Sequence, residues 1–196
     1  MLFRSPAADY SLAALAADNL AMGDHDLVVG HSMGGATATL AASLRPEWAG
    51  RLVLVDPAWR FPTAEEAAAE KQQEFAALDR DAGEIRAAYS AWDERDSAAK
   101  IQEVARVWRP AVEGIIDANL GVDLRDAALS LAVPTLVICG DPAAGSIVTH
   151  AEGDAVASAN PNVRLVRIAG AGHNPHRDDS EAVWQALADW LGDLLG

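Results

Sequence analysis

Four short apolar runs, separated by segments with a helical pattern, constrain the fold of this chain more than any other feature. Continuous apolar runs of this length are typical of strands that are covered on both faces, as in a parallel sheet. Because such runs alternate with helices, we expect an α/β protein whose mostly parallel sheet is flanked by helices. The runs are residues 26–30, 51–57, 134–140 and 163–168. The helices that we expect around them are residues 11–22, 33–44, 149–159 and 180–195.

Residues 61–131 differ in character from the rest of the chain. They are rich in Ala, Glu, Gln and Arg and contain no convincing strand. Thr63-Ala64-Glu65-Glu66 fits a capping box that opens a helix. We therefore predict an all-helical insertion at residues 61–131, with residues 1–60 and 132–196 forming the α/β core. Further helical stretches in the insertion are expected at residues 82–92 and 98–120.

The composition of the chain indicates which partners it is unsuited to bind and where in the cell we expect it. The chain has 196 residues, 51% of them hydrophobic, which suits a folded protein with a real core. Its formal net charge of −14 repels nucleic acid and anionic membranes, so we expect neither as a partner. The chain shows no signal-peptide pattern and no run of about 18 apolar residues, so we expect a cytoplasmic protein. Composition leaves the oligomeric state open.

The pattern Gly-x-Ser-x-Gly occurs once, from Gly30 to Gly34, where an apolar run meets a helix. This is the context of a nucleophile elbow, a sharp turn that lifts a serine above the carboxyl edge of a sheet. Glycines suit it because strand and helix pass closely there. Ser32 is therefore our candidate nucleophile, and the N–H of Met33, at the helix start, is a candidate oxyanion donor. A glycine-rich turn without chemistry is the alternative.

A serine hydroxyl needs a base to take its proton, and the chain has five histidines. His173 is the best candidate because it follows the last apolar run, in a loop that would share a sheet edge with Ser32. His31, beside the nucleophile, is a weaker candidate for contact with a substrate. His173 and His176 could share a metal, but no third ligand accompanies them, so we expect no metal and no cofactor.

The base in turn needs a carboxylate to orient it, and two aspartates compete for this role. Asp141 directly follows the third apolar run, and Asp56 ends the second; each precedes a proline. We favour Asp141, because one helix and one strand fit between it and His173. Cys139 lies inside an apolar run, where cysteine behaves as a small buried hydrophobe, so we do not expect it to be a nucleophile. As the only cysteine, it also excludes an intrachain disulfide.

Three motifs together resemble those of the α/β-hydrolase fold family. They are Gly-His-Ser-Met-Gly-Gly at 30–35, Gly-Asp-Pro at 140–142 and Gly-Ala-Gly-His at 170–173, and their order Ser, Asp, His is that of the family. The resemblance implies that residues 61–131 form a cap over the active site, lined by Trp59, Trp92 or Trp108. Family members usually carry several strands and a His-Gly loop before the elbow, the source of a second oxyanion donor. The resemblance therefore implies a truncated α/β-hydrolase, without the N-terminal strands.

The function that we expect is that of a serine hydrolase acting on a small ester, amide or lactone through an acyl-enzyme. Ser32 would attack the carbonyl, His173 would move the proton, and Asp141 would orient His173. Relatives by resemblance use the same residues for carbon–carbon bond hydrolysis or cofactor-free haloperoxidation. The remaining alternative is an inactive, hydrolase-like scaffold that binds a small ligand.

Overall fold

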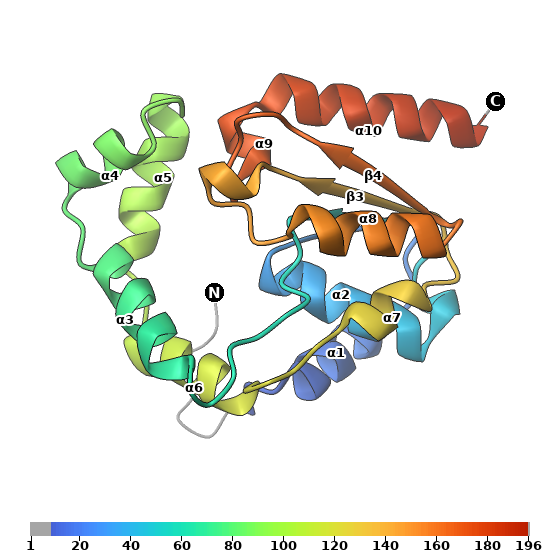
Figure 1. The fold of residues 1–196 in the computed structure, drawn as a ribbon, viewed down its shortest axis with the longest axis horizontal. Coiled ribbons are helices and arrows are strands. Elements are labelled where there is room, and N and C mark those ends of the chain that lie inside the picture. The colour runs from blue at the N-terminus through green and yellow to red at the C-terminus, as the bar shows by residue number, and fades with distance from the viewer. Residues whose placement is uncertain (1–8, 196) are drawn as a thin grey trace. The chain divides into compact units, whose positions relative to one another are not determined.

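A parallel sheet of four strands forms the centre of the larger part of the molecule (Figure 1). The structure is a computed structural model, and it describes residues 9–195. Residues 1–8 of the predicted core segment, and residue 196, lie outside the described residues. Every neighbouring pair of strands is parallel, in the order β1-β2-β3-β4. The strands are β1 (Val28–His31), β2 (Leu52–Val55), β3 (Thr135–Cys139) and β4 (Val163–Arg167).

Helices cover both faces of this sheet, which confirms the predicted fold class. On one face α1 packs on α2, α2 on α7, and α7 on α8, while α10 covers the other face (Figure 1). The four helices that we expected around the strands are present, with bounds within a residue of the prediction. The helices of this part are α1 (Leu12–Ala21), α2 (Met33–Leu44), α7 (Arg125–Leu129), α8 (His150–Ala159), α9 (Pro175–Asp178) and α10 (Ser180–Leu195). The short 3-10 helices are η1 (Pro46–Trp48) and η2 (Pro142–Ala144).

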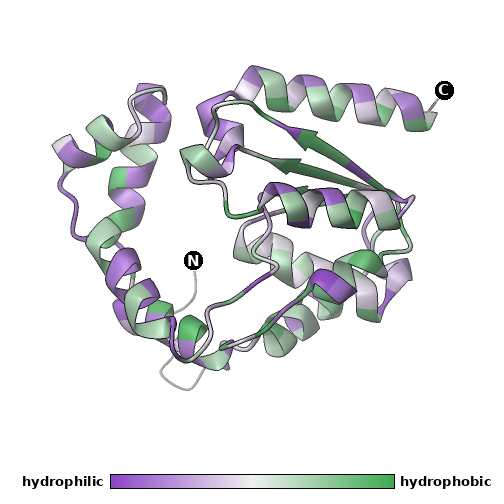
Figure 2. Cartoon of the chain, viewed as in Figure 1, coloured by the Kyte–Doolittle hydropathy of each residue, from purple (hydrophilic) through white to green (hydrophobic). Residues whose placement is uncertain are grey.

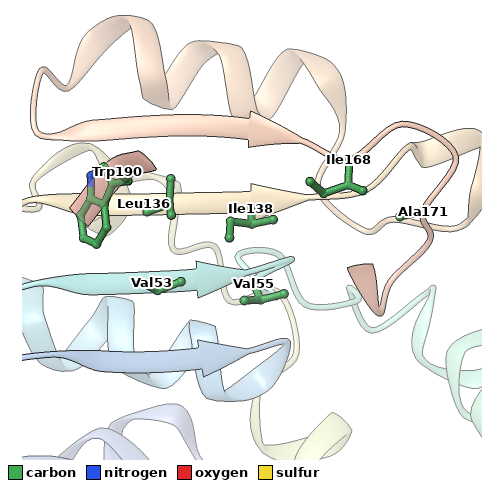
Figure 3. Packing of buried hydrophobic residues seen from close by; sticks show 7 residues of the cluster. All are labelled: Val53, Val55, Leu136, Ile138, Ile168, Ala171 and Trp190. Atoms are coloured by element: carbon green, nitrogen blue, oxygen red, sulfur yellow. The ribbon is translucent and has the colours of Figure 1, made fainter. Parts of the chain in front are cut away.

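The two central strands are apolar because both of their faces are buried. All residues of β2 and β3 are buried, and Figure 2 shows β3 in a continuous hydrophobic colour. Alternate side chains of a strand point to opposite faces, and one set forms a cluster with Trp190 of α10. The edge strand β4 carries exposed Arg164 instead. The members of the cluster in Figure 3 are Val53, Val55, Leu136, Ile138, Ile168, Ala171 and Trp190.

Strand β1 forms the other edge of the sheet and, among the described residues, pairs with β2 alone. Val29 at the middle of β1 is 61% exposed. A groove of about 370 Å³ lies along this edge, between α1 and α2, and its lining includes Met22, Val29 and Gly34. None of the helices in the described part of the chain combines the length and apolarity needed to cross a bilayer.

A second compact unit consists of Phe61–Val122 together with residues 9–11. Its described residues form helices without a strand: α3 (Ala67–Leu78), α4 (Ala82–Ala88), α5 (Glu94–Val104) and α6 (Arg109–Ala118). Tyr10 packs against α6, where a Cβ on Gly114 would lie 2.6 Å from its ring, and its carbonyl accepts a hydrogen bond from Asn119 Nδ2 at 2.9 Å.

The observed helical unit differs from the predicted insertion in two ways. The helix expected over residues 98–120 is two helices, because Pro110 in the first turn of α6 cannot continue the ladder of α5. The insertion was expected to end at residue 131, but α7, which precedes this point, belongs to the unit that contains the sheet. There α7 packs against α2 and α8.

Candidate active site

The turn between β1 and α2 holds Ser32 in a backbone conformation that L-residues rarely adopt. Its φ is 55° and its ψ is −121°. The neighbouring strand stabilises this turn, since Ser32 N donates to Val55 O at 3.0 Å. The carbonyl of Ser32 accepts from Ala36 N and Ala58 N, each at 3.0 Å. Ser32 is therefore fixed at the carboxyl edge of the sheet, as expected of a nucleophile elbow.

Close packing explains two glycines around this turn, but not the second glycine of the five-residue pattern. A Cβ on Gly30 would lie 2.5 Å from the carbonyl oxygen of Gly34. A Cβ on Gly35 would lie 2.8 Å from the Cβ of Pro57. A Cβ on Gly34 would meet nothing within 4 Å in the described structure. Steric exclusion of a side chain therefore operates at Gly30 and Gly35.

The structure brings His173 to Ser32, as the sequence predicts. His173 Nε2 lies 2.9 Å from Ser32 Oγ, within hydrogen-bond distance. Its loop, between β4 and α9, is anchored through the carbonyl and the N–H of the Ala171–Gly172 peptide. Ala171 O accepts from Asp141 N, and Gly172 N donates to Asp178 Oδ2, both at 2.7 Å. The base is thus presented by a loop with defined main-chain contacts.

Asp56 completes a chain of hydrogen bonds from the serine. Its Oδ2 lies 2.7 Å from His173 Nδ1, and the side chain is fully buried. The carboxylate also accepts from Ser146 Oγ at 2.6 Å, from Ile147 N at 3.0 Å and from Val148 N at 3.4 Å. These donors lie in the loop after β3, and sequence reasoning did not single them out. Donors arranged in this way stabilise a buried negative charge.

The prediction that Asp141 orients His173 is therefore wrong. Asp141 uses its Oδ1 to accept from Ala143 N at 2.8 Å, as the N-cap of η2. Asp56 and Asp141 end neighbouring strands at the same edge, so the apolar runs before them do not distinguish them. The backbone does: Asp56 has a φ of 41°, whereas the Pro142 turn engages the side chain of Asp141 locally.

His31, expected to contact a substrate, makes its hydrogen bond within the protein. His31 Nε2 lies 2.8 Å from the carbonyl oxygen of His173. Burial, with smaller effects from the charges of His173 and His176, lowers the pKa of His31 to about 4. Its ring is therefore neutral near pH 7. A second cation beside His173 would oppose formation of an imidazolium there, and a neutral His31 avoids this cost.

The three tryptophans with predicted roles in lining the site belong to different units. Trp59 is 4% exposed, and its Nε1 donates to Thr39 Oγ1 at 3.0 Å, so it packs inside the unit with the sheet. Trp92 stacks on Tyr89 in the helical unit, with ring centroids 4.1 Å apart. Contact of substrate with Trp92 or Trp108 stays a prediction.

Two further sequence-based expectations concern Met33 and Cys139. Met33 is the first residue of α2, where backbone N–H groups point out of the helix, and its part as an oxyanion donor stays a prediction. Burial, and then the charge of Asp56, raises the pKa of the Cys139 thiol to about 12, which keeps it from acting as a thiolate. Within residues 9–195, no three or more metal-binding side chains come together to hold an ion.

Solved structures with a similar fold share little sequence with this chain. An N-formylmaleamic acid deformylase from Pseudomonas putida S16 is 23% identical, with a TM-score of 0.73 over 94% of this chain and 75% of its own. A bromoperoxidase from Bacillus anthracis (16% identity) and an esterase from Exiguobacterium antarcticum (18%) have the same TM-score of 0.73, over 96% of this chain and 76% of theirs. At these identities the likeness shows the fold. No curated protein matches the sequence.

The sequence itself matches the profile described as the alpha/beta hydrolase family. The match spans residues 3–186, which is most of the 196 residues of the chain. It includes both the sheet with the Ser32 turn and the helical unit. The chain therefore belongs to the alpha/beta hydrolase family.

Proposed function

We propose that this protein is a serine hydrolase that cleaves a small ester, amide or lactone through an acyl-enzyme on Ser32. The observation that carries the proposal is the unbroken chain of hydrogen bonds from Ser32 Oγ to His173 Nε2 (2.9 Å) and from His173 Nδ1 to Asp56 Oδ2 (2.7 Å). Membership of the family supports a hydrolase in general. The acyl class rests on serine being the nucleophile of the chain.

The chemistry follows from the direction of these hydrogen bonds. A carboxylate at Asp56 can only accept, so in this reaction Nδ1 of His173 carries the proton and Nε2 accepts the one from Ser32. Ser32 Oγ attacks the substrate carbonyl as its proton moves to Nε2. The N–H of Met33 donates to the oxyanion of the tetrahedral intermediate. Asp56 stabilises the imidazolium that forms on His173.

The second half of the reaction uses the same groups in reverse order. His173 gives its proton to the leaving alcohol or amine, whose bond to the carbonyl carbon breaks. Water then attacks the acyl group on Ser32 while His173 Nε2 takes a proton from it. Collapse of this second intermediate releases the carboxylic acid, and the proton returns to Ser32 Oγ. The strained φ of 55° at Ser32 supports this assignment, because backbone strain of this kind is concentrated at functional sites.

Labelling with a fluorophosphonate probe tests the proposal directly. We expect the purified protein to become labelled on Ser32, and Ser32→Ala to remove the label without lowering the melting temperature. Ser43→Ala is the matched control, because Ser43 lies on α2 and bonds to Leu40 O. Labelling that survives Ser32→Ala, or a folded protein that takes up no label, would reject the proposal. Ligand binding that is unchanged by Ser32→Ala and His173→Ala, without turnover, would favour a non-catalytic scaffold.

A further inference from the structure

A hydrogen bond joins the residue before the proposed nucleophile to the main chain of the proposed base. His31 is the last residue of β1, and its Nε2 lies 2.8 Å from the carbonyl oxygen of His173. A carbonyl oxygen only accepts, so the proton lies on Nε2 of His31. One side chain thus connects the strand that ends at Ser32 with the loop that carries His173.

We propose that His31 is a positioning residue that holds the main chain of His173, so that the imidazole of His173 stays aligned with Ser32. This inference rests on the proposed function, since it assigns His31 a part in the same reaction. It also replaces the expectation, drawn from the sequence, that His31 contacts a substrate.

The other contacts of the loop that carries His173 do not fix the carbonyl that His31 binds. The main-chain anchors at Ala171 and Gly172 both precede His173 in the chain. Asp56 holds the imidazole from its Nδ1 side, and Nε2 lies at the far end of two side-chain torsions. A shift of the main chain at His173 therefore moves Nε2 even while Nδ1 stays bonded. The bond from His31 acts on the carbonyl of His173 itself, where such a shift would begin.

The surroundings of His31 favour a neutral aromatic donor over a charged one. Its ring centroid lies 4.8 Å from the centroid of His173 and 4.8 Å from that of His176, so it packs between two imidazoles. A lysine or arginine could donate to the same carbonyl, but its charge would oppose the imidazolium that forms on His173. Neutral histidine supplies the N–H and the flat ring together.

Two substitutions separate the hydrogen bond from the packing. His31→Phe keeps a flat ring without the donor, whereas His31→Gln keeps an N–H at a similar distance from the main chain. We expect His31→Phe to lower the rate of fluorophosphonate labelling, and kcat for a p-nitrophenyl ester, about 10- to 100-fold with little change in KM. His31→Gln should restore most of the rate. His150→Phe is the matched control, because His150 is exposed at the start of α8.

A proton NMR signal gives a second readout that does not depend on catalysis. The Nδ1–H of His173, bonded to buried Asp56, should give a resonance far downfield that is protected from exchange with water. We expect it to be sharp in the unmodified protein and in His31→Gln, and broadened in His31→Phe. If His31→Phe does not fold, His31→Asn carries the same comparison, because its amide is too short to reach the carbonyl.

The outcomes distinguish this inference from the proposed function. A folded His31→Phe protein that labels at the normal rate and keeps a sharp resonance would overturn the positioning role. Equal losses in His31→Gln and His31→Phe would also overturn it, since the donor would then not matter. If the unmodified protein takes up no label while its resonance still broadens in His31→Phe, the proposed function fails and the positioning of His173 stands.

Discussion

Replacing Asp56 by asparagine gives the sharpest test of which carboxylate serves His173. Asparagine has nearly the same shape and tolerates the positive φ of 41° at this position, so the backbone gains no strain. Its amide nitrogen, however, is a donor. Turned toward His173, it requires Nδ1 to accept and moves the ring proton to Nε2, the atom that must take the proton of Ser32. Asp56→Asn therefore stabilises the wrong tautomer of the base.

The expected loss can be scaled from serine enzymes with this arrangement. Placing the base in the wrong tautomer lowers kcat by about 10⁴, which is about 5.5 kcal/mol of transition-state stabilisation. The free energy of unfolding should change less than the activation barrier does. The carboxylate accepts from Ser146 Oγ, Ile147 N and Val148 N as well as from His173, and exchanging charged for neutral bonds costs about 1–3 kcal/mol. Activity should thus collapse in a protein that still folds.

Asp141→Asn is the matched control, because sequence reasoning favours Asp141 for the same role. Asparagine caps a turn about as well as aspartate, so its bond with Ala143 N and the stability of η2 should persist. We expect labelling within a few-fold of normal. Rates of fluorophosphonate labelling and ester hydrolysis, with a thermal melt for each variant, supply the measurement. A collapse in Asp141→Asn, with activity retained in Asp56→Asn, would refute the assignment of Asp56.

Three further predictions concern the residues around the site. Gly30→Ala should lower the free energy of unfolding by about 1–3 kcal/mol in a denaturant titration, because its Cβ would meet Gly34 O at 2.5 Å. Gly34→Ala should leave the free energy of unfolding unchanged, because its Cβ would meet no atom within 4 Å among the described residues. A larger loss in Gly34→Ala than in Gly30→Ala would contradict the packing described. The pKa of His31 is lowered from 6.5 to about 4, so between these two pH values the unfolded chain binds a proton at His31 that the folded state does not bind. Stability should be unaffected above pH 6.5 and fall by up to about 3 kcal/mol as the pH drops toward 4, and His31→Gln should remove this part of the slope. Cys139, whose pKa is raised to about 12, should not react with maleimide at pH 8 in the native protein, and should react after unfolding in guanidinium. Mass spectrometry measures the modification, and a fully modified native protein would contradict the burial of Cys139.

Local patterns were enough to predict the elements of the sheet unit. A strand such as β3 is buried on both faces, so its apolar run is visible in the sequence without knowledge of its neighbours. The serine turn is visible for a related reason, since Gly30 is required by atoms only four and five residues away. His173 could be placed because the carboxyl ends of parallel strands share one edge. Each of these inferences depends on contacts that are short in sequence or general to parallel sheets.

The helical unit was harder to delimit from the sequence. Helix α5 ends at Val104 and α6 begins at Arg109, so the break is short, and the strongest helix breaker near it, Pro110, already lies in the first turn of α6. Tyr10, far away in the sequence, packs on Gly114 and so joins residues 9–11 to this unit. A contact of this kind leaves no periodic signal, because a single side chain meets a glycine far away in the sequence.

The sequence by itself determined the parallel sheet, the strained serine and the histidine that faces it. Only the tertiary structure decided which aspartate completes the chain of hydrogen bonds and what His31 does. Asp56 and Asp141 have the same local surroundings, an apolar strand before and a proline after, so their sequences predict the same position at the sheet edge. The choice depends on the turn at φ 41° and on donors from Ser146 to Val148, which reach Asp56 across the sheet. These are long-range contacts of single atoms, and they exist only once β2 and β3 lie side by side.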